Sequence, residues 1–194
     1  STSLTRILML QDLSQYILDI SENSLKAEAS RVDILLSEST RGNGIELSVS
    51  DNGKGMDSEQ ILMVQDPFFT TRTERRVGLG IPFLKQAAEL CGGGLEIISQ
   101  KRRGTTIRAS FTRDCIDCPP LGDISATLVV LFVGWPDRDF VFRYFFDGRE
   151  FTTGTDDIID ILEDRNLLKA PEVAGWLGRF FRENIDMLRS GREC

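Results

Sequence analysis

Apolar residues recur at three- and four-residue steps from Leu10 to Lys26, and polar residues occupy the opposite stripe of the same segment. This period matches the turn of an α-helix and predicts an amphipathic helix there. Asp19 and Asn23 stand four residues apart in that segment, so their side chains would share one face of the helix. By itself, such a pair is typical of a solvated polar face.

Two later segments, residues 32–36 and 45–49, alternate apolar and polar residues with the period of a half-buried β-strand. The glycine- and asparagine-containing stretch between them predicts a hairpin turn. The second strand would then end at Asp51, directly before a stretch that contains Gly53 and Gly55. Taken alone, this stretch is typical of a turn, because glycine reaches positive φ without a Cβ penalty. It becomes part of a ligand site only if other segments converge on it.

A second glycine pair, Gly78 and Gly80, precedes a periodic apolar segment that begins with Ile81-Pro82 and stops at three consecutive glycines. We expect a helix here, because proline suits a first helical turn and glycine suits the position after the last one. The free amides and the positive dipole end at such a helix start can bind an anion. Alternation in 95–98 and 105–111 predicts two more strands.

A proline-containing stretch at 115–120 is interpreted as a linker. The prediction is therefore an α+β domain over residues 1–114 and a small α+β extension over 121–194. In the extension, the apolar runs 124–133 and 140–146 predict two strands, and periodic segments that start near Thr155 and Pro171 predict two helices. The pattern of the extension indicates no function.

The 194 residues carry a formal net charge of −7, which argues against general binding to nucleic acid or to an anionic membrane, since either would be repelled. The longest apolar run is far shorter than the roughly 20 residues that span a bilayer, and the N-terminus lacks a signal-peptide pattern. We therefore expect a cytoplasmic protein. The sequence contains no histidine, so it supplies no histidine base, metal ligand or phosphoacceptor.

Four cysteines are present, Cys91, Cys115, Cys118 and Cys194. Cys115 and Cys118 form one Cys-x-x-Cys pair, whereas a tetrahedral zinc site within the chain would need a second pair. Ordinary thiols are the favoured interpretation. A redox pair and a metal site shared between subunits are the alternatives.

Set side by side, the polar and glycine-rich segments resemble the ATP-binding domain of the GHKL superfamily, which includes DNA gyrase, the heat-shock chaperone, sensor histidine kinases and mismatch-repair ATPases. The segment 17–27, ILDISENSLKA, is similar to the N box, and DNGKGM at 51–56 to the first glycine box. DPFFTTR at 66–72 is similar to the segment before the lid of histidine kinases, and VGLGIPFLKQAAELCGGG at 77–94 to the second glycine box. The resemblance ends with Gly104-Thr105-Thr106-Ile107, covers roughly residues 10–112 and is strongest to the histidine-kinase-like ATPase (HATPase) domain.

The resemblance implies a two-layer α/β sandwich, in which helices cover one face of a mixed, mostly antiparallel sheet. It also implies that the domain binds ATP and Mg²⁺. Asn23 would coordinate the Mg²⁺ that bridges the phosphates, since an amide oxygen suits that hard cation. Asp51 would accept a hydrogen bond from the adenine amino group, and Gly53 and Gly55 would let the backbone close over the base. Thr105 would lie beside the Asp51 carboxylate.

At the phosphate end, the resemblance implies that the amides of Gly78 and Gly80 bind the phosphates and that Arg72 neutralises their charge. It implies further nucleotide contacts at four positions, namely Ala27, Met56, Thr71 and Leu79.

Asp19 departs from the family pattern. ATP-hydrolysing relatives place a glutamate four residues before the metal-binding asparagine as general base, and sensor kinases usually place an asparagine there. Asp19 keeps the carboxylate but is one methylene shorter, so activation of water and insufficient reach are both compatible with it. Glu22 is a weaker alternative base, because it points about 100° away from Asn23 around the helix.

The resemblance implies a kinase-like protein that phosphorylates a partner in trans or hydrolyses ATP in a signalling or regulatory role. Because the sequence has no histidine, the phosphoacceptor would lie on another protein, as in the anti-sigma-factor serine kinases. The alternative is a binding module that senses ATP, turns over little of it and regulates a partner protein. Both options allow a homodimer.

Overall fold

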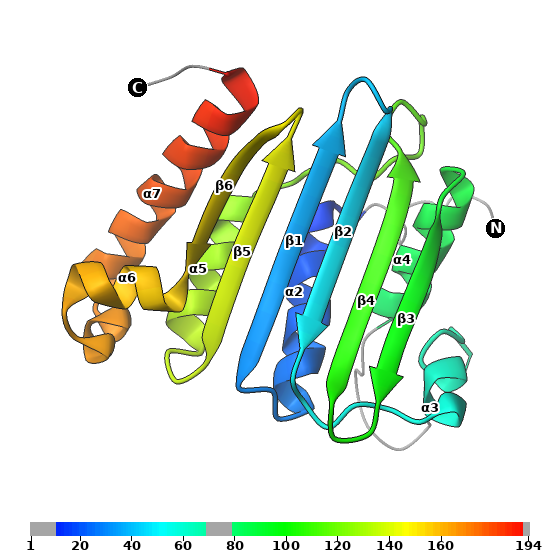
Figure 1. Cartoon of the computed structure of the whole chain (residues 1–194), viewed down its shortest axis with the longest axis horizontal. Coiled ribbons are helices and arrows are strands. Elements are labelled where there is room, and N and C mark those ends of the chain that lie inside the picture. The colour runs from blue at the N-terminus through cyan, green and yellow to red at the C-terminus, as the bar shows by residue number, and fades with distance from the viewer. Residues whose placement is uncertain (1–10, 69–78, 192–194) are drawn as a thin grey trace.

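A computed structural model describes residues 11–68 and 79–191, and these residues form one six-stranded sheet in the order β3-β4-β2-β1-β5-β6 (Figure 1). All neighbouring strands are antiparallel except the parallel pair β1 and β5. The strands are β1 (Arg31–Ser39), β2 (Gly44–Asp51), β3 (Gly94–Gln100), β4 (Gly104–Thr112), β5 (Asp139–Phe146) and β6 (Arg149–Gly154). This mixed, mostly antiparallel α+β fold confirms the predicted fold class.

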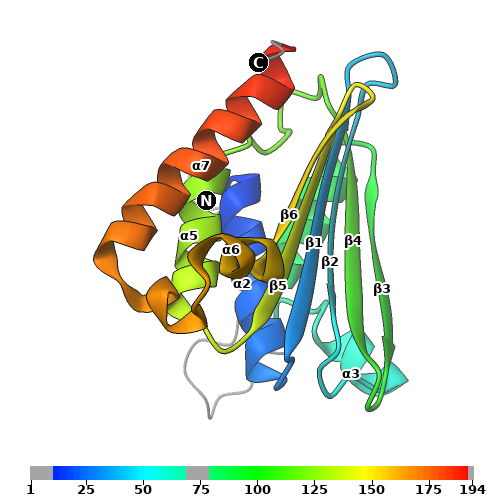
Figure 2. The ribbon, with the colours of Figure 1, turned by 60° about the vertical axis from the view of Figure 1, so that its left-hand side comes forward.

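Helices cover one face of the sheet and leave the other face open (Figure 2). The covering helices include α2 (Leu13–Lys26), α4 (Gly80–Leu90), α5 (Ile124–Gly134) and α7 (Pro171–Ser190). Shorter elements are α3 (Ser58–Met63), α6 (Thr155–Leu162) and the 3-10 helix η1 (Arg165–Lys169). Within 11–68 and 79–191, none of the helices combines the length and apolar character needed to cross a membrane.

Helix α2 lies behind the middle of the sheet (Figure 1). Its first turn is fixed by Asp12, whose side chain accepts a hydrogen bond from the Gln15 amide at 2.8 Å, as expected of an N-cap residue. Leu13, Ile17 and Ile20 are buried in the core between α2 and the sheet. The predicted amphipathic helix is thus confirmed over Leu13–Lys26, and its expected start at Leu10 lies outside the described residues.

Strands β1 and β2 form the predicted hairpin. Their buried positions alternate, because one face of the sheet meets the helices and the other meets solvent. The register places Val32 opposite Asp51, so Asp51 stands at the very end of β2. The pairing therefore places Asp51 at the end of the strands that lies next to the C-terminal end of α2.

The predicted strand at 124–133 is wrong, because this segment is helix α5. Asp123 caps the helix by accepting a hydrogen bond from the Ala126 amide at 2.9 Å. A continuous apolar run fits a buried helix as well as a buried strand, and periodicity does not separate the two. The apolar side chains are covered on more than one side, since α5 packs against both α2 and α7.

The C-terminal residues continue the same sheet. β5 pairs with β1 in parallel, with Ile34 opposite Phe142. The end of α7 is fastened to the sheet by Arg189, which donates a hydrogen bond to the buried carboxylate of Glu38, as does the hydroxyl of Tyr144. Burial and the Glu38 carboxylate raise the pKa of Tyr144. The division of the chain at 115–120 stays a prediction.

Candidate functional site

The carboxylate of Asp51 is held by two donors from different segments. The Ser24 hydroxyl of α2 donates to Oδ2 at 2.7 Å, and the Gly53 amide donates to Oδ1 at 2.8 Å. Ser24 is buried, whereas Asp51 remains partly exposed. A carboxylate held in this way keeps lone pairs for a further donor while its orientation is fixed.

Main-chain atoms approach each other closely around the first glycine motif. A Cβ on Gly53 would stand 2.7 Å from the carbonyl oxygen of Ala27. Gly55 has φ +65°, and a Cβ there would overlap the carbonyl of Gln100. Gly104 has φ +95°, and a Cβ there would overlap the carbonyl of Asp51. Glycine is therefore required at these positions by space, and at the last two also by backbone conformation.

Hydrogen bonds between hydroxyls and amides connect this motif to the β3–β4 hairpin. The Met56 amide donates to the Ser99 hydroxyl at 2.8 Å, and the hydroxyls of Ser99 and Thr105 are 2.8 Å apart. Thr105 is paired with Asp51 across β2 and β4. Asp51, Gly53 and Met56 of the first glycine box and Thr105 of the closing segment are thus brought together where β2 ends and β4 begins.

Helix α2 also carries Asp19, Asn23 and Ala27. The carbonyl of Ala27 accepts a hydrogen bond from the Lys54 amide at 2.9 Å, so the helix end lies against the first glycine motif. One turn earlier, the partly exposed side chain of Asn23 has no hydrogen bond to any residue that the structure describes. Its amide oxygen is therefore available to a ligand or a cation.

Asp19 lies at the opposite end of this row, beside the start of α4. A Cβ on Gly80 would stand 3.1 Å from Cβ and 3.3 Å from Oδ2 of Asp19. Gln15 donates to Oδ1 at 3.1 Å and Gln11 donates to Oδ2 at 3.4 Å. Both carboxylate oxygens therefore have neutral amide donors. Glu22, the weaker alternative, is on the same helix and partly exposed.

The N-terminus of α4 has no side-chain cap. Leu79 is the N-cap residue, is 41% exposed and makes no capping hydrogen bond. Pro82 has no amide proton, and the Phe83 amide donates to the Leu79 carbonyl at 3.0 Å, which leaves the amides of Gly80 and Ile81 without helical partners. Such an end suits an anion. Thr71, Arg72 and Gly78 lie outside the described residues.

Tyr16 lies three residues before Asp19 on α2. It is fully buried, and its hydroxyl has no hydrogen-bond partner among residues 11–68 and 79–191. Burial, together with the nearby Asp19 carboxylate, raises its pKa to about 12. The Tyr16 hydroxyl is therefore uncharged at neutral pH.

Sequence reasoning did not find the side chains that support the site, namely Ser24, Ser99, Gln11 and Gln15. The Gln15–Asp19 pair had a signal, because residues four apart on a helix can form a hydrogen bond. The bond between Ser24 and Asp51 had none, since it joins a helix to a strand end 27 residues away.

Three of the cysteines lie in the described part of the chain, and none of them contacts Asp19, Asn23 or Asp51 in the hydrogen bonds of those residues. Cys91 is buried at the end of α4, and the Cys115 thiol lies 3.8 Å from the Leu90 carbonyl. Burial and the neighbouring Cys115 raise the pKa of the Cys91 thiol to about 12. Cys91, Cys115 and Cys118 are free thiols, and no cluster of three or more metal-binding side chains is found in the described part of the chain. Cys194 lies outside that part.

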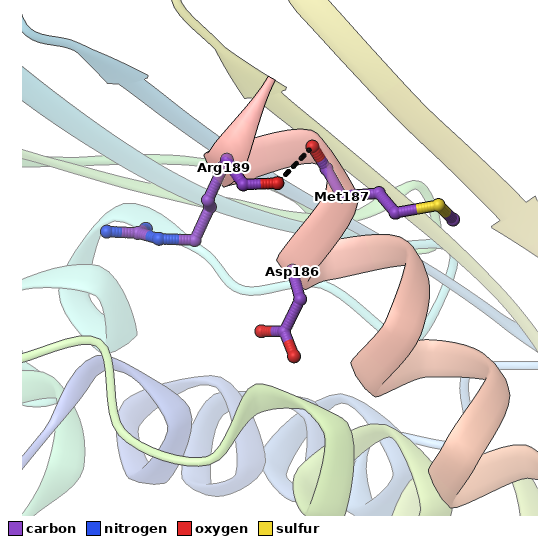
Figure 3. Close-up of a pocket in the computed structure, with 4 residues that line it drawn as sticks. Asp186, Met187 and Arg189 are labelled. Atoms are coloured by element: carbon purple, nitrogen blue, oxygen red, sulfur yellow. Dashed lines mark hydrogen bonds between the residues drawn. The ribbon is translucent and has the colours of Figure 1, made fainter. Parts of the chain in front are cut away.

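A hollow of about 550 Å³ lies at the C-terminal end of α7 and is lined by Asp186, Met187, Arg189 and Ser190 (Figure 3). The Ser190 hydroxyl donates to the Met187 carbonyl at 3.3 Å, and Arg189 turns inward to Glu38. None of these residues belongs to the row formed by Asp19, Asn23 and Asp51. The hollow is therefore separate from the candidate site.

Three comparisons relate the chain to known proteins. Residues 10–114 match the family model "Histidine kinase-, DNA gyrase B-, and HSP90-like ATPase". The sensor histidine kinase ZraS of Escherichia coli is 33% identical over 94 residues, 48% of this chain and 20% of that protein. Sporulation kinase D of Bacillus subtilis is 30% identical over 95 residues, 49% of this chain and 19% of that protein. The chain therefore spans about a fifth of the length of these relatives.

Among solved structures, the N-terminal domain of a DNA repair protein has a TM-score of 0.52 at 16% identity. The alignment covers 77% of this chain and 54% of that one. At this level of identity the likeness concerns the fold alone.

Proposed function

We propose that this chain, which belongs to the histidine kinase-, DNA gyrase B- and HSP90-like ATPase family, binds Mg-ATP and uses it in a signalling or regulatory role. The observation that carries the proposal is that two segments, the end of β2 and the start of α4, meet on helix α2. Helix α2 contacts Asp51 through Ser24 and Gly80 through Asp19. From Asp19 to Ala27 it spans about 12 Å, a length on the scale of one nucleotide.

At the adenine end, Asp51 accepts a hydrogen bond from the amino group of the base. Its fixed carboxylate supports this role, because both oxygens are oriented by Ser24 and Gly53. Thr105 lies across the strand pair and borders the same position. The close packing of Gly53 against Ala27 and of Gly55 against Gln100 fixes the backbone beside Asp51, and we expect this backbone to lie against the base.

At the phosphate end, the residues fit Mg²⁺ with a triphosphate. Asn23 offers an amide oxygen that has no partner within the described residues, and a hard cation prefers oxygen ligands. The Gly80 amide at the uncapped start of α4 binds a phosphate oxygen. When bound, the cation neutralises phosphate charge and polarises the γ-phosphoryl group for transfer.

If ATP is turned over, Asp19 is the candidate general base, because it is the carboxylate beside Gly80. Its role is to accept a proton from water or from a substrate hydroxyl. If the phosphoryl group is transferred to a histidine, that residue lies outside these 194 residues, which contain none.

A second function, an ATP-sensing module with little turnover, is favoured by the contacts of Asp19. Gln11 and Gln15 occupy both of its oxygens, and aspartate is shorter than the family glutamate. In this case, the nucleotide state would be read by a protein partner through the C-terminal residues, whose strand β5 joins the sheet next to β1. A protein partner, a homodimer and a cytoplasmic location are parts of the proposal for either function.

Calorimetric titration with Mg-ATP tests the binding. Asp51→Asn should abolish or strongly weaken it, whereas Asp137→Asn, an equal charge change at an exposed turn, should leave it unchanged. Undiminished binding by Asp51→Asn would remove the adenine assignment. Phosphate release and label transfer from γ-labelled ATP to a co-purified protein then separate an enzyme from a sensor, and an unchanged turnover in Asp19→Asn would remove Asp19 as the base.

A further inference from the structure

Three cysteines from two distant segments meet at the C-terminal end of helix α4. Cys91 directly follows the last residue of α4 and is buried, and its carbonyl accepts a hydrogen bond from the Thr112 amide at 3.0 Å. Cys115 and Cys118 enclose the turn after β4, because the Cys118 amide donates to the Cys115 carbonyl at 3.0 Å. The bond at Thr112 thus holds the Cys-x-x-Cys turn against the end of α4.

The Cys91 thiol has both of the other thiols as neighbours. The thiols of Cys115 and Cys118 are each hydrogen-bonded to it. The Cys115 thiol also lies 3.8 Å from the Leu90 carbonyl, one residue before Cys91. The Cys118 thiol lies 3.8 Å from the carbonyl of the residue that follows it, Pro119. Cys115 is therefore the thiol that is directed at the end of α4.

Cys91 and Cys115 differ in their access to solvent. Cys91 is 2% exposed, whereas Cys115 is partly exposed. Burial, and after it the hydrogen bond with Cys115, raises the pKa of the Cys91 thiol to about 12. Since the thiolate is the form that attacks an oxidant, Cys91 does not react first. Cys115 is the thiol that a small oxidant reaches from solvent.

We propose that these cysteines form a peroxide-sensitive site, in which Cys91 and Cys115 become joined by a disulfide between the end of α4 and the turn after β4. First, the Cys115 thiolate attacks one oxygen of hydrogen peroxide, and the O–O bond breaks. The products are a sulfenic acid and hydroxide, which takes up a proton to form water. The Cys91 sulfur then attacks the sulfenic acid sulfur, and the S–O bond breaks. The hydroxyl leaves as water with the Cys91 proton, so the two thiols are oxidised and the peroxide is reduced.

The first step makes the second one easier. A sulfenic acid at Cys115 is neutral, so a thiolate there no longer opposes the ionisation of Cys91. The two side chains are already in contact, and reacting groups that are held together need no diffusional encounter. The disulfide closes a loop that contains β3 and β4, which restricts the unfolded chain. No nucleotide takes part, so the inference does not depend on the proposed function.

The test is peptide mapping by mass spectrometry after the folded chain is treated with hydrogen peroxide and its remaining thiols are alkylated. All samples carry Cys194→Ser, which leaves only the cysteines of this site. The expected product is a disulfide between Cys91 and Cys115 that dithiothreitol reverses. The midpoint of thermal unfolding should rise by about 5 °C on oxidation and return on reduction.

Cys118→Ser is the matched control, because it removes a neighbouring thiol and leaves the proposed pair. It should form the same disulfide and show the same thermal shift, whereas Cys91→Ser and Cys115→Ser should each lose that shift. If Cys91→Ser does not fold, Cys115→Ser at the partly exposed turn gives the same test. Three results would overturn the inference: no disulfide in the folded chain, a disulfide between Cys115 and Cys118, or an unchanged loss of thiols in Cys115→Ser.

Discussion

At the Asp51 end of the site, main-chain atoms lie so close together that Gly53, Gly55 and Gly104 have no room for a side chain. At the Gly80 end, helix α4 begins without a side-chain cap, and the Asp19 carboxylate lies beside its first residue. At the first end, the Ser24 hydroxyl and the Gly53 amide already fix the orientation of the Asp51 carboxylate. At the second end, the amides of Gly80 and Ile81 have no helical partner, and Asp19 forms no ion pair within residues 11–68 and 79–191. The base of a bound nucleotide would therefore enter a preformed place, whereas its phosphates would supply partners for the amides at the start of α4.

The largest effect is expected for the unfolding free energy of Gly104→Ala, which changes the Asp51 end of the site. The added Cβ would overlap the Asp51 carbonyl, and alanine would have to adopt φ +95°. We expect a loss of at least about 3 kcal/mol in the free energy of unfolding, because overlap and backbone strain combine. Urea unfolding measures this loss of free energy. Gly94→Ala, with no atom within 4 Å of its Cβ, should cost much less, and equal losses would contradict the crowding argument.

Ser24→Ala tests whether the fixed orientation of Asp51 contributes to binding. The variant removes the donor at 2.7 Å from Oδ2, and we expect ATP affinity to fall by about tenfold, the value of one hydrogen bond to a charged group. The matched control is Ser21→Ala on the same helix, whose buried hydroxyl has no hydrogen-bond partner among the described residues. Similar affinities in the two variants would show that Ser24 does not orient Asp51.

Gly80→Ala probes the open end with the same chemical change as Gly104→Ala. Its Cβ would stand 3.1 Å from that of Asp19, a tight contact that is offset by the better helix propensity of alanine, so stability should change by less than about 1 kcal/mol. ATP affinity should fall by about fivefold, since the methyl group narrows the approach to the amides. Adenosine titration provides the control: an equal loss for adenosine would mean that the phosphate end is not involved.

The smallest effect is expected for Tyr16→Phe. At neutral pH the unfolding free energy should change by less than about 1 kcal/mol, because the lost hydroxyl has no partner in the described residues. The pKa of Tyr16 is about 12 in the folded protein against about 10 when unfolded. The part of the unfolding free energy that comes from burying Tyr16 in its neutral form is therefore fully present below pH 10. It is lost as the pH rises toward 12.

Unfolding measured between pH 9 and pH 11 checks this expectation. Tyr16→Phe should lose stability less steeply than the wild type, which keeps both of the tyrosines in the sequence. The same steepness in both proteins would mean that Tyr16 ionises as easily in the folded state as in the unfolded state, which would contradict its raised pKa.

The sequence allowed the elements around the site to be predicted, because their patterns are local. Alternation placed the strand that ends at Asp51, and helical periodicity placed Asp19 and Asn23 on one face of α2. The apolar run at 124–133 carries no period, so its helix was missed. That β5 pairs with β1 also has no local signal, since the register depends on how the helices fill the space between distant segments. The roles of the site residues stay predictions until binding is measured.

The parallel pairing of β1 with β5 has a consequence for synthesis. A chain on the ribosome that has reached residue 114 already contains β1 to β4, but one edge of β1 has no partner and α2 lacks the cover of α5. Contacts between such distant segments form slowly, and an unpaired strand edge invites association with other chains. The nascent protein therefore passes through a stage that is prone to aggregation, and chaperone dependence should decrease once the C-terminal half has emerged.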